Sequence, residues 1–250
     1  MKRVAVLILA GCLAVGASAA TVAELLDAAA AAEARLDSAR ALELYLQADA
    51  AQPGDVRTLQ KIARQYSDLV LDQITDAERQ RHAGAALDYS RRAEELDPRD
   101  PVSVLSLAIS YGKLAASSDT RAKVRYSRLA KQEAERALAL DPGYAWAHHV
   151  LGRWHREVAT LGTAARGLVW LLYGGLPGAS PAEAVAHLQR AVELEPSELN
   201  HHLELGFALV AVGRTPEARQ AWMQGLAMPS IGKHDESAKR EAREAMARLK

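Results

Sequence analysis

Histidine is the residue type in this chain that is most clearly clustered and best able to do chemistry. Six of its eight histidines lie between positions 148 and 202: His148, His149, His155, His187, His201 and His202. His148 and His155 are seven residues apart, so on a helix they share one face and could form a two-histidine metal site. However, that face offers no acidic or cysteine ligand, and a metal site needs three or four donors. We therefore expect no metal and no cofactor, and histidines that pack near Trp154 and Tyr144.

The chain carries no other pattern that is typical of catalysis. It has no glycine-rich phosphate loop, no His-Glu-x-x-His, no Gly-x-Ser-x-Gly and no calcium loop. Lys and Arg number 31, as do Asp and Glu, so the basic excess that is typical of nucleic-acid binding is missing. The single cysteine, Cys12, excludes a disulfide framework and a cysteine-built metal site. We expect neither an enzyme nor a nucleic-acid binding protein.

The helices that carry these side chains repeat along the chain. Four helix ends run from an alanine to a proline, at 48–53, 93–98, 137–142 and 191–196. Proline disfavours helix at the residue before it, so each segment predicts a helix stop. Seven residues before each of these alanines lies another: Ala41, Ala86, Ala130 and Ala184. Seven residues span two helical turns, so each pair lies on one face and allows a neighbouring helix to approach closely.

A matching pattern of large and small residues follows each proline. It comprises Leu59, Ile62, Ala63 and Tyr66, then Val104, Leu107, Ala108 and Tyr111, then Leu151-Gly152 and Leu205-Gly206. Together the two patterns resemble the tetratricopeptide repeat (TPR), in which the first helix carries Leu with Gly or Ala and the second carries Ala, an aromatic residue, Ala and Pro. The resemblance implies an all-α fold, a right-handed α-solenoid of about five helix-turn-helix repeats with long helices and a C-terminal capping helix.

The predicted repeat domain spans 21–230 and the capping helix lies in 231–250. The repeats are expected at about 22–55, 56–100, 101–144, 145–198 and 199–230, with an insert at 162–179. The prolines stand 44 to 54 residues apart, against 34 for the family, so the helices are expected to be longer than in a typical TPR. The signals for helix starts agree with these repeats. A capping box formed by Thr75 and Glu78 should begin a helix over 76–96, which follows a helix over 56–73. Further caps are expected at Ser118 or Asp119, at Ser180 and at Thr215.

The first twenty residues have the layout of a secretory signal peptide. Lys2 and Arg3 precede an apolar run at 4–15, and Ala17-Ser18-Ala19 offers a cleavage site near Ala19 or Ala20. This predicts a bacterial protein in the periplasm, or secreted. An alternative uses Leu9-Ala10-Gly11-Cys12, which resembles a lipobox and would make the chain a membrane lipoprotein through Cys12.

Two further stretches resemble a particular family. His-His-Val-Leu-Gly-Arg-Trp-His at 148–155 and Tyr-Gly-Gly-Leu-Pro at 173–177, followed by 184–196, are similar to the regulator of microtubule dynamics family and its bacterial relatives. The resemblance implies a helical-repeat scaffold with an enlarged penultimate repeat and no catalytic chemistry. Because a secreted chain cannot share a cytoskeletal role, we expect only the fold and the binding character to carry over.

The insert contains six apolar residues in a row, at 168–173. Glycines bracket the run, so we expect a short helix that folds back and is buried. If it is exposed instead, Trp170, Leu171, Leu172 and Tyr173 become candidates for a lid or a membrane contact.

In TPR proteins the first helices line the concave surface, and this resemblance assigns candidate partner-binding residues. They are Arg57, Gln60, Arg64, Leu105, Ile109, Trp146, His149, Arg153, Arg156, Leu203 and Phe207. The Lys/Asn carboxylate clamp of chaperone-binding members is absent, since Gln60, Arg64 and Ile109 stand in its place. We therefore expect an apolar groove with arginines in a non-enzymatic periplasmic scaffold that binds a protein or peptide. The alternative is a carrier of a lipid or other apolar molecule, with the insert as a lid.

Overall fold

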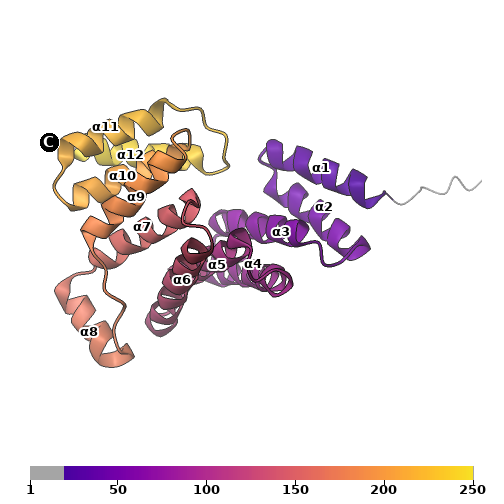
Figure 1. The fold of residues 1–250 in the computed structure, drawn as a ribbon, viewed down its shortest axis with the longest axis horizontal. Coiled ribbons are helices and arrows are strands. Elements are labelled where there is room, and N and C mark those ends of the chain that lie inside the picture. Colours follow the sequence, from indigo (N-terminus) through magenta and orange to yellow (C-terminus); the bar gives the residue numbers. More distant parts are fainter. Residues whose placement is uncertain (1–19, 250) are drawn as a thin grey trace, which may run out of the picture.

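The computed structural model describes residues 20–249, which form helices and connecting loops without a strand (Figure 1). The helices are α1 (Val22–Ala34), α2 (Ser38–Ala51), α3 (Val56–Leu69), the 3-10 turn η1 (Val70–Asp72), α4 (Asp76–Leu96), α5 (Pro101–Ser117), α6 (Thr120–Leu140), α7 (Ala145–Ala159), α8 (Thr163–Tyr173), α9 (Pro181–Leu194), α10 (Leu199–Ala211), α11 (Thr215–Ala227) and α12 (Asp235–Arg248). None of these helices is both long and apolar enough to span a bilayer. The predicted signal peptide, with Cys12, lies outside the described residues except for its last residue, Ala20.

Consecutive helices pack in pairs, and the pairs stack into an α-solenoid. The pairs are α1/α2, α3/α4, α5/α6, α7/α9 and α10/α11, and α12 packs on α10 and α11. Helix α8 interrupts the fourth pair and lies beside α6 (Figure 1). Each pair buries its apolar face against the next one, as repeat proteins do. The predicted all-α repeat fold is confirmed.

The second helix of the first four pairs ends in the same way. Its C-cap residue has φ between −140° and −131° and ψ between 73° and 97°, and its N–H donates to the alanine carbonyl four residues earlier. The four C-caps are Gln52, Asp97, Asp141 and Glu195. Each precedes a proline, which excludes the α conformation at the residue before it. The predicted helix stops are confirmed.

The small residues predicted at the helix contacts are buried. Ala41, Ala86, Ala130 and Ala184 are at most 5% exposed. On the first helices, alanine takes the small position in the early pairs and glycine takes it in the later ones. A Cβ atom on Gly152 would lie 2.5 Å from Cγ of Leu188, and one on Gly206 would overlap the indole of Trp222. The α7/α9 and α10/α11 pairs therefore pack too closely for any side chain at these two positions.

Most helix starts agree with the sequence. Thr75 and Glu78 form the predicted capping box, Asp119 rather than Ser118 caps α6, and Ser180 caps α9. The expectation that Thr215 caps α11 is wrong. The N-cap is Arg214, whose guanidinium pairs with Glu217, and Thr215 is already helical. The chain turns at Gly213, where φ is +77°, so the helix begins one residue earlier than expected.

The expected burial of the insert is also wrong. Helix α8 projects from the body of the solenoid (Figure 1), and most of its large apolar side chains are exposed. The physical reason is that α9 takes the position against α7 and leaves α8 only the flank of α6. There, Arg128 donates hydrogen bonds to the carbonyls of Tyr173 and Gly175 and holds the end of α8.

Candidate partner-binding groove

Helices α3, α7 and α10 and the start of α12 surround a cavity of about 500 Å³. Its lining is Arg64, Asp68, Trp146, His149, Arg153, Arg156, Glu198, Asn200, Leu203, Glu204, Phe207, residues 231–235, Ala238 and Glu241. A cavity of this size lies within the range of ligand sites. The structure thus brings together seven of the predicted residues: Arg64, Trp146, His149, Arg153, Arg156, Leu203 and Phe207. We call this cavity the groove.

Four predicted residues do not line the groove. Arg57 is exposed elsewhere on α3, and the Gln60 amide donates to Ser103 Oγ at 2.8 Å and to the Asp100 carboxylate. Leu105 is 2% exposed and Ile109 packs on the same apolar cluster. Gln60, Leu105 and Ile109 thus join helices to one another, so fewer residues line the groove than the repeat resemblance implied.

The insert is no lid over the groove. None of the residues that line the 500 Å³ cavity belongs to α8. Trp170 instead borders a separate cavity of about 330 Å³, with Val158 and Leu161 on one side and Pro177 on the other. The exposed residues Trp170, Leu171 and Leu172 therefore lie on a different part of the surface from the predicted partner-binding residues.

The groove carries acidic side chains as well as the arginines that were expected in an otherwise apolar groove. Arg156 pairs with Glu204, and Arg153 Nε lies 2.8 Å from a carboxylate oxygen of Glu157. Glu204 follows Asn200 by four residues and precedes Phe207 by three, so helical spacing alone could have assigned it to the groove. Glu198 and Glu241 add further negative charge.

The loop between α11 and α12 crosses the mouth of the groove to α3, which no periodicity in the sequence indicates. His234 Nε2 lies 2.9 Å from the backbone carbonyl of Asp68, and Lys233 forms an ion pair with Asp72. Burial raises the pKa of the Asp68 carboxyl, although Arg64 and His234 oppose that shift. The two ends of the solenoid are therefore in contact across the groove.

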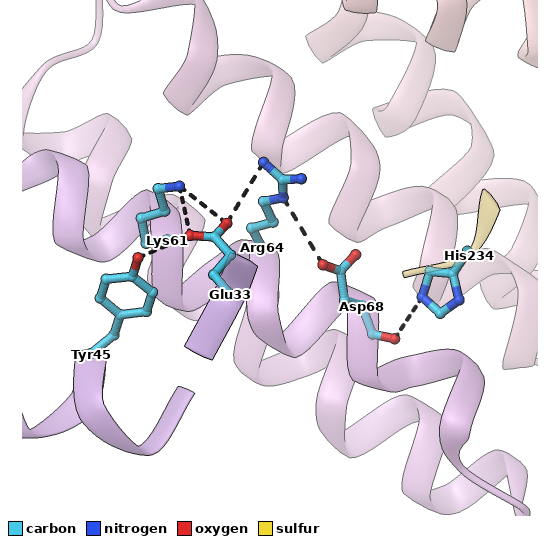
Figure 2. A network of polar contacts seen from close by, with 6 residues as sticks. All are labelled: Glu33, Tyr45, Lys61, Arg64, Asp68 and His234. Atoms are coloured by element: carbon cyan, nitrogen blue, oxygen red, sulfur yellow. Dashed lines mark hydrogen bonds and ion pairs between the residues drawn. The ribbon is translucent and has the colours of Figure 1, made fainter. Parts of the chain in front are cut away.

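Figure 2 shows how this contact continues into the first helices. Glu33 on α1 accepts hydrogen bonds from Tyr45 Oη at 2.9 Å and Lys61 Nζ at 2.8 Å, and Arg64 Nη1 lies 3.8 Å away. Burial acts to raise the pKa of Glu33, but Lys61 and Tyr45 outweigh it and hold that pKa below its ordinary value. Arg64 Nε is also 4.0 Å from the Asp68 carboxylate, so Arg64 links this network to the groove.

The clustered histidines are pairs that join helices. His149 on α7 and His201 on α10 have their Nδ1 atoms 3.0 Å apart, and Trp146 packs on both rings. His148 and His187 form a similar contact of 2.9 Å between α7 and α9.

Burial favours the neutral form of three of these histidines, His149, His187 and His201. Burial, helped by His202, lowers the pKa of His201 to about 4. Burial, helped by His148 and His155, does the same for His187. Within residues 20–249, no three His, Cys, Asp or Glu side chains come together in a way that could hold a metal ion. The imidazoles of the two pairs pack against each other, and Trp146 packs on one of the pairs.

The groove continues into an apolar cavity of about 360 Å³. The two share Arg156 and Phe207, and the apolar cavity adds Val210, Trp222, Ala245 and Leu249. The arrangement offers an apolar pocket beside guanidinium groups, which can recognise an apolar side chain next to an acid.

Known proteins with related sequences share one family name. "Regulator of microtubule dynamics protein 2" of Homo sapiens is 23% identical over 197 residues, which cover 78% of this chain and 48% of the relative. "Regulator of microtubule dynamics protein 1" of Bos taurus is 26% identical over 152 residues, which cover 60% of this chain and 48% of the relative. The chain thus spans about half the length of these relatives.

A solved structure with a similar fold is that of a TPR protein. A thermophilic TPR protein from Thermus thermophilus matches with a TM-score of 0.65 and 21% identity, over 91% of this chain and all of its own. This likeness shows the fold. The model of the family described as "Regulator of microtubule dynamics protein 1-3" matches residues 23–250. The chain, a TPR-like helical repeat protein, therefore belongs to the regulator of microtubule dynamics family.

Proposed function

We propose that the chain is a non-enzymatic scaffold that binds a protein or peptide segment in its groove. The TPR-like fold suggests a protein-interaction scaffold. The observation that carries the proposal is the cavity of about 500 Å³ that joins an apolar pocket at Phe207. His149, which lines the groove, contacts His201, and burial lowers the pKa of both, which supports recognition rather than acid–base chemistry by this pair.

The groove suits a segment with an apolar anchor beside an acidic residue. Phe207 and Trp222 border the pocket for the anchor, and Arg153, whose side chain is 58% exposed, remains accessible to a carboxylate. Arginine binds carboxylates through two parallel hydrogen bonds, which fixes the orientation of the partner. Both arginines already pair with a glutamate, Arg156 with Glu204 and Arg153 with Glu157, but the Arg156 side chain is only 22% exposed, so the more exposed Arg153 is the main site for the acid.

Peptides selected from a random library on the immobilised chain test this proposal. We expect the selected peptides to share an acidic residue near a large apolar one and to bind Arg153→Glu at least about tenfold more weakly. Arg190→Glu is the matched control, since Arg190 lies on α9 outside the groove and likewise pairs with a glutamate, Glu193. Equal affinity for both variants, in titrations of folded protein, would contradict the proposal.

The proposal includes a location outside the cytoplasm, in the periplasm or secreted. Its support is the sequence of residues 1–20, with Lys2, Arg3 and the apolar run that follows. A fusion of residues 1–40 to a phosphatase that is active only after export should be active, and an inactive fusion would contradict it. Cys12→Ser separates the alternatives, because only a lipoprotein loses its membrane attachment with that change.

A further inference from the structure

Helix α8 exposes an unusual amount of apolar surface for a helix in a folded repeat protein. The side chains that are more than half exposed are Leu168 at 56%, Trp170 at 70%, Leu171 at 71% and Leu172 at 57%. Contiguous apolar patches are uncommon on protein surfaces unless they serve as interaction sites. The groove does not use this patch, since no α8 residue lines it.

The helix is held in a defined position. Gly174 ends it in the left-handed conformation, with φ +73°. Arg128 on α6 donates a hydrogen bond of 2.6 Å to the Tyr173 carbonyl and one of 2.9 Å, from Nε, to the Gly175 carbonyl. Helix α8 therefore lies beside the first half of α6, as Figure 1 shows, and presents its apolar side chains from a fixed place.

The surroundings of α8 are cationic. The first half of α6 carries exposed Arg121, Lys123 and Arg125, and none of the three forms an ion pair with the described residues. No Asp or Glu occurs within 120–132, and none occurs within 158–182. This charge pattern differs from that of the groove, where arginines alternate with acids.

We propose that α8 and the first half of α6 form a docking edge for an anionic lipid bilayer. Helices that lie in a membrane interface combine Trp and Leu with Lys or Arg, so that apolar side chains enter the headgroup region while cations meet lipid phosphates. In this arrangement Trp170 and Leu171 enter the bilayer surface. Arg121 and Arg125, which share the face of α6 that carries Arg128, face the headgroups. The edge attaches the scaffold to a membrane and leaves the groove accessible, independently of what the groove binds.

The test uses the full chain and phosphatidylcholine vesicles with about 30% phosphatidylglycerol that carries brominated acyl chains. Brominated chains quench only tryptophans that reach the acyl region. Trp154 and Trp222 are at most 7% exposed, and Trp170 is the exposed indole of α8. The apolar run at 4–15 could bind vesicles by itself, so binding of the whole chain would not test the edge. The test therefore measures the quenching of Trp170, which reports on α8 alone. We expect quenching with these vesicles, little with pure phosphatidylcholine, and none in Trp170→Phe.

Charge and apolar variants separate the two parts of the edge. Each basic residue contributes about fivefold to partition onto an anionic surface, so Arg121→Glu/Arg125→Glu should raise the lipid needed for half-maximal quenching at least about thirtyfold. Leu171→Asp/Leu172→Asp should raise it at least about tenfold. The matched control is Arg240→Glu/Arg243→Glu, which changes charge equally on exposed positions of α12.

The proposal is overturned by any of three results: no Trp170 quenching in the wild type, equal quenching with pure phosphatidylcholine, or an equal loss in the α12 control. Tight binding of a protein to this edge, without lipid binding, would also overturn it. Peptide binding by the groove should remain unchanged in all edge variants.

Discussion

The N-terminal part of the solenoid (22–96) and its C-terminal part (145–227) join their helices through different kinds of polar contact. In the N-terminal part, Glu33 collects Tyr45 and Lys61 into a charged network. In the C-terminal part, histidine pairs join α7 to α9 and α10, and glycines let the helices approach closely. The comparison teaches that alanine and leucine packing specifies the repeat, while polar contacts decide under which conditions each part is stable.

The histidine pairs and the Glu33 network lose their contributions to stability in different pH ranges. The folded-state pKa of His201 is about 4, below its ordinary value of 6.5, so the folded state favours the neutral ring. Its contribution to stability is complete above pH 6.5 and is lost as the pH falls towards 4. The pKa of Glu33 is lowered from 4.5, so its contribution is complete above that value and is lost only below it. In mild acid, the C-terminal part should therefore weaken first.

The largest expected effect is that of Gly206→Ala, which should destabilise the fold by about 3 kcal/mol. The new Cβ atom would overlap the Trp222 indole, which is 1% exposed and donates to the Leu203 carbonyl at 2.9 Å. Gly112→Ala on α5 is the matched control, because nothing lies within 4 Å of its Cβ position. It should stabilise by about 0.5–1 kcal/mol through helix propensity. Thermal unfolding of both variants tests this prediction. Equal melting temperatures for Gly206→Ala and Gly112→Ala would contradict the close approach of α10 to α11.

Acid should have the next largest effect. A histidine whose pKa falls to about 4 on folding costs on the order of 2 kcal/mol of stability between pH 7 and pH 5. Urea unfolding at both pH values measures this loss, and His149→Leu/His201→Leu should reduce it. A double variant with the full wild-type dependence on pH would assign the sensitivity to other groups.

Lys61→Met tests the charged network and should cost about 1 kcal/mol. Lys61 is 44% exposed, so water screens its pair with Glu33 and limits the loss. Arg57→Met, an exposed change on the same helix, should alter the unfolding free energy by less than about 0.5 kcal/mol. If Arg57→Met costs as much as Lys61→Met, the network contributes nothing specific.

The smallest effect on stability is expected where the two parts meet across the groove. Lys233→Ala removes the ion pair with Asp72, which is partly exposed, so global stability should change by at most about 0.5 kcal/mol. Amide exchange of residues 228–234 should nevertheless accelerate, because the loop loses its anchor at Asp72 in η1. Unchanged exchange would show that His234 alone holds the loop.

The repeat framework was predictable because its signals are local. Proline fixes the helix stops at Asp97 and Asp141, and a buried alanine at a regular distance marks each helix contact. The groove was predictable only in part. Carrying TPR positions over assumes equal repeats, whereas Leu105 on α5 is 2% exposed and packs in an apolar cluster with Val104 and Ala108 instead of lining the groove.

Two features depend on contacts that no short segment encodes. The apolar run of α8 fits burial or exposure equally well, and its exposure follows from α9 occupying the place against α7. The loop through Lys233 meets Asp72 across 161 positions of sequence, so neither periodicity nor a motif could indicate it. Both features depend on contacts between elements that lie far apart in the sequence.

Photo-crosslinking with a library-selected peptide tests most directly whether the groove is the binding site. A photoreactive residue at Glu241, which lines the groove, is compared with the same residue at Arg190 on α9. Both positions are exposed, so neither replacement should disturb the fold. The account predicts crosslinking from position 241 and none from position 190. Crosslinking from 190 alone would contradict it.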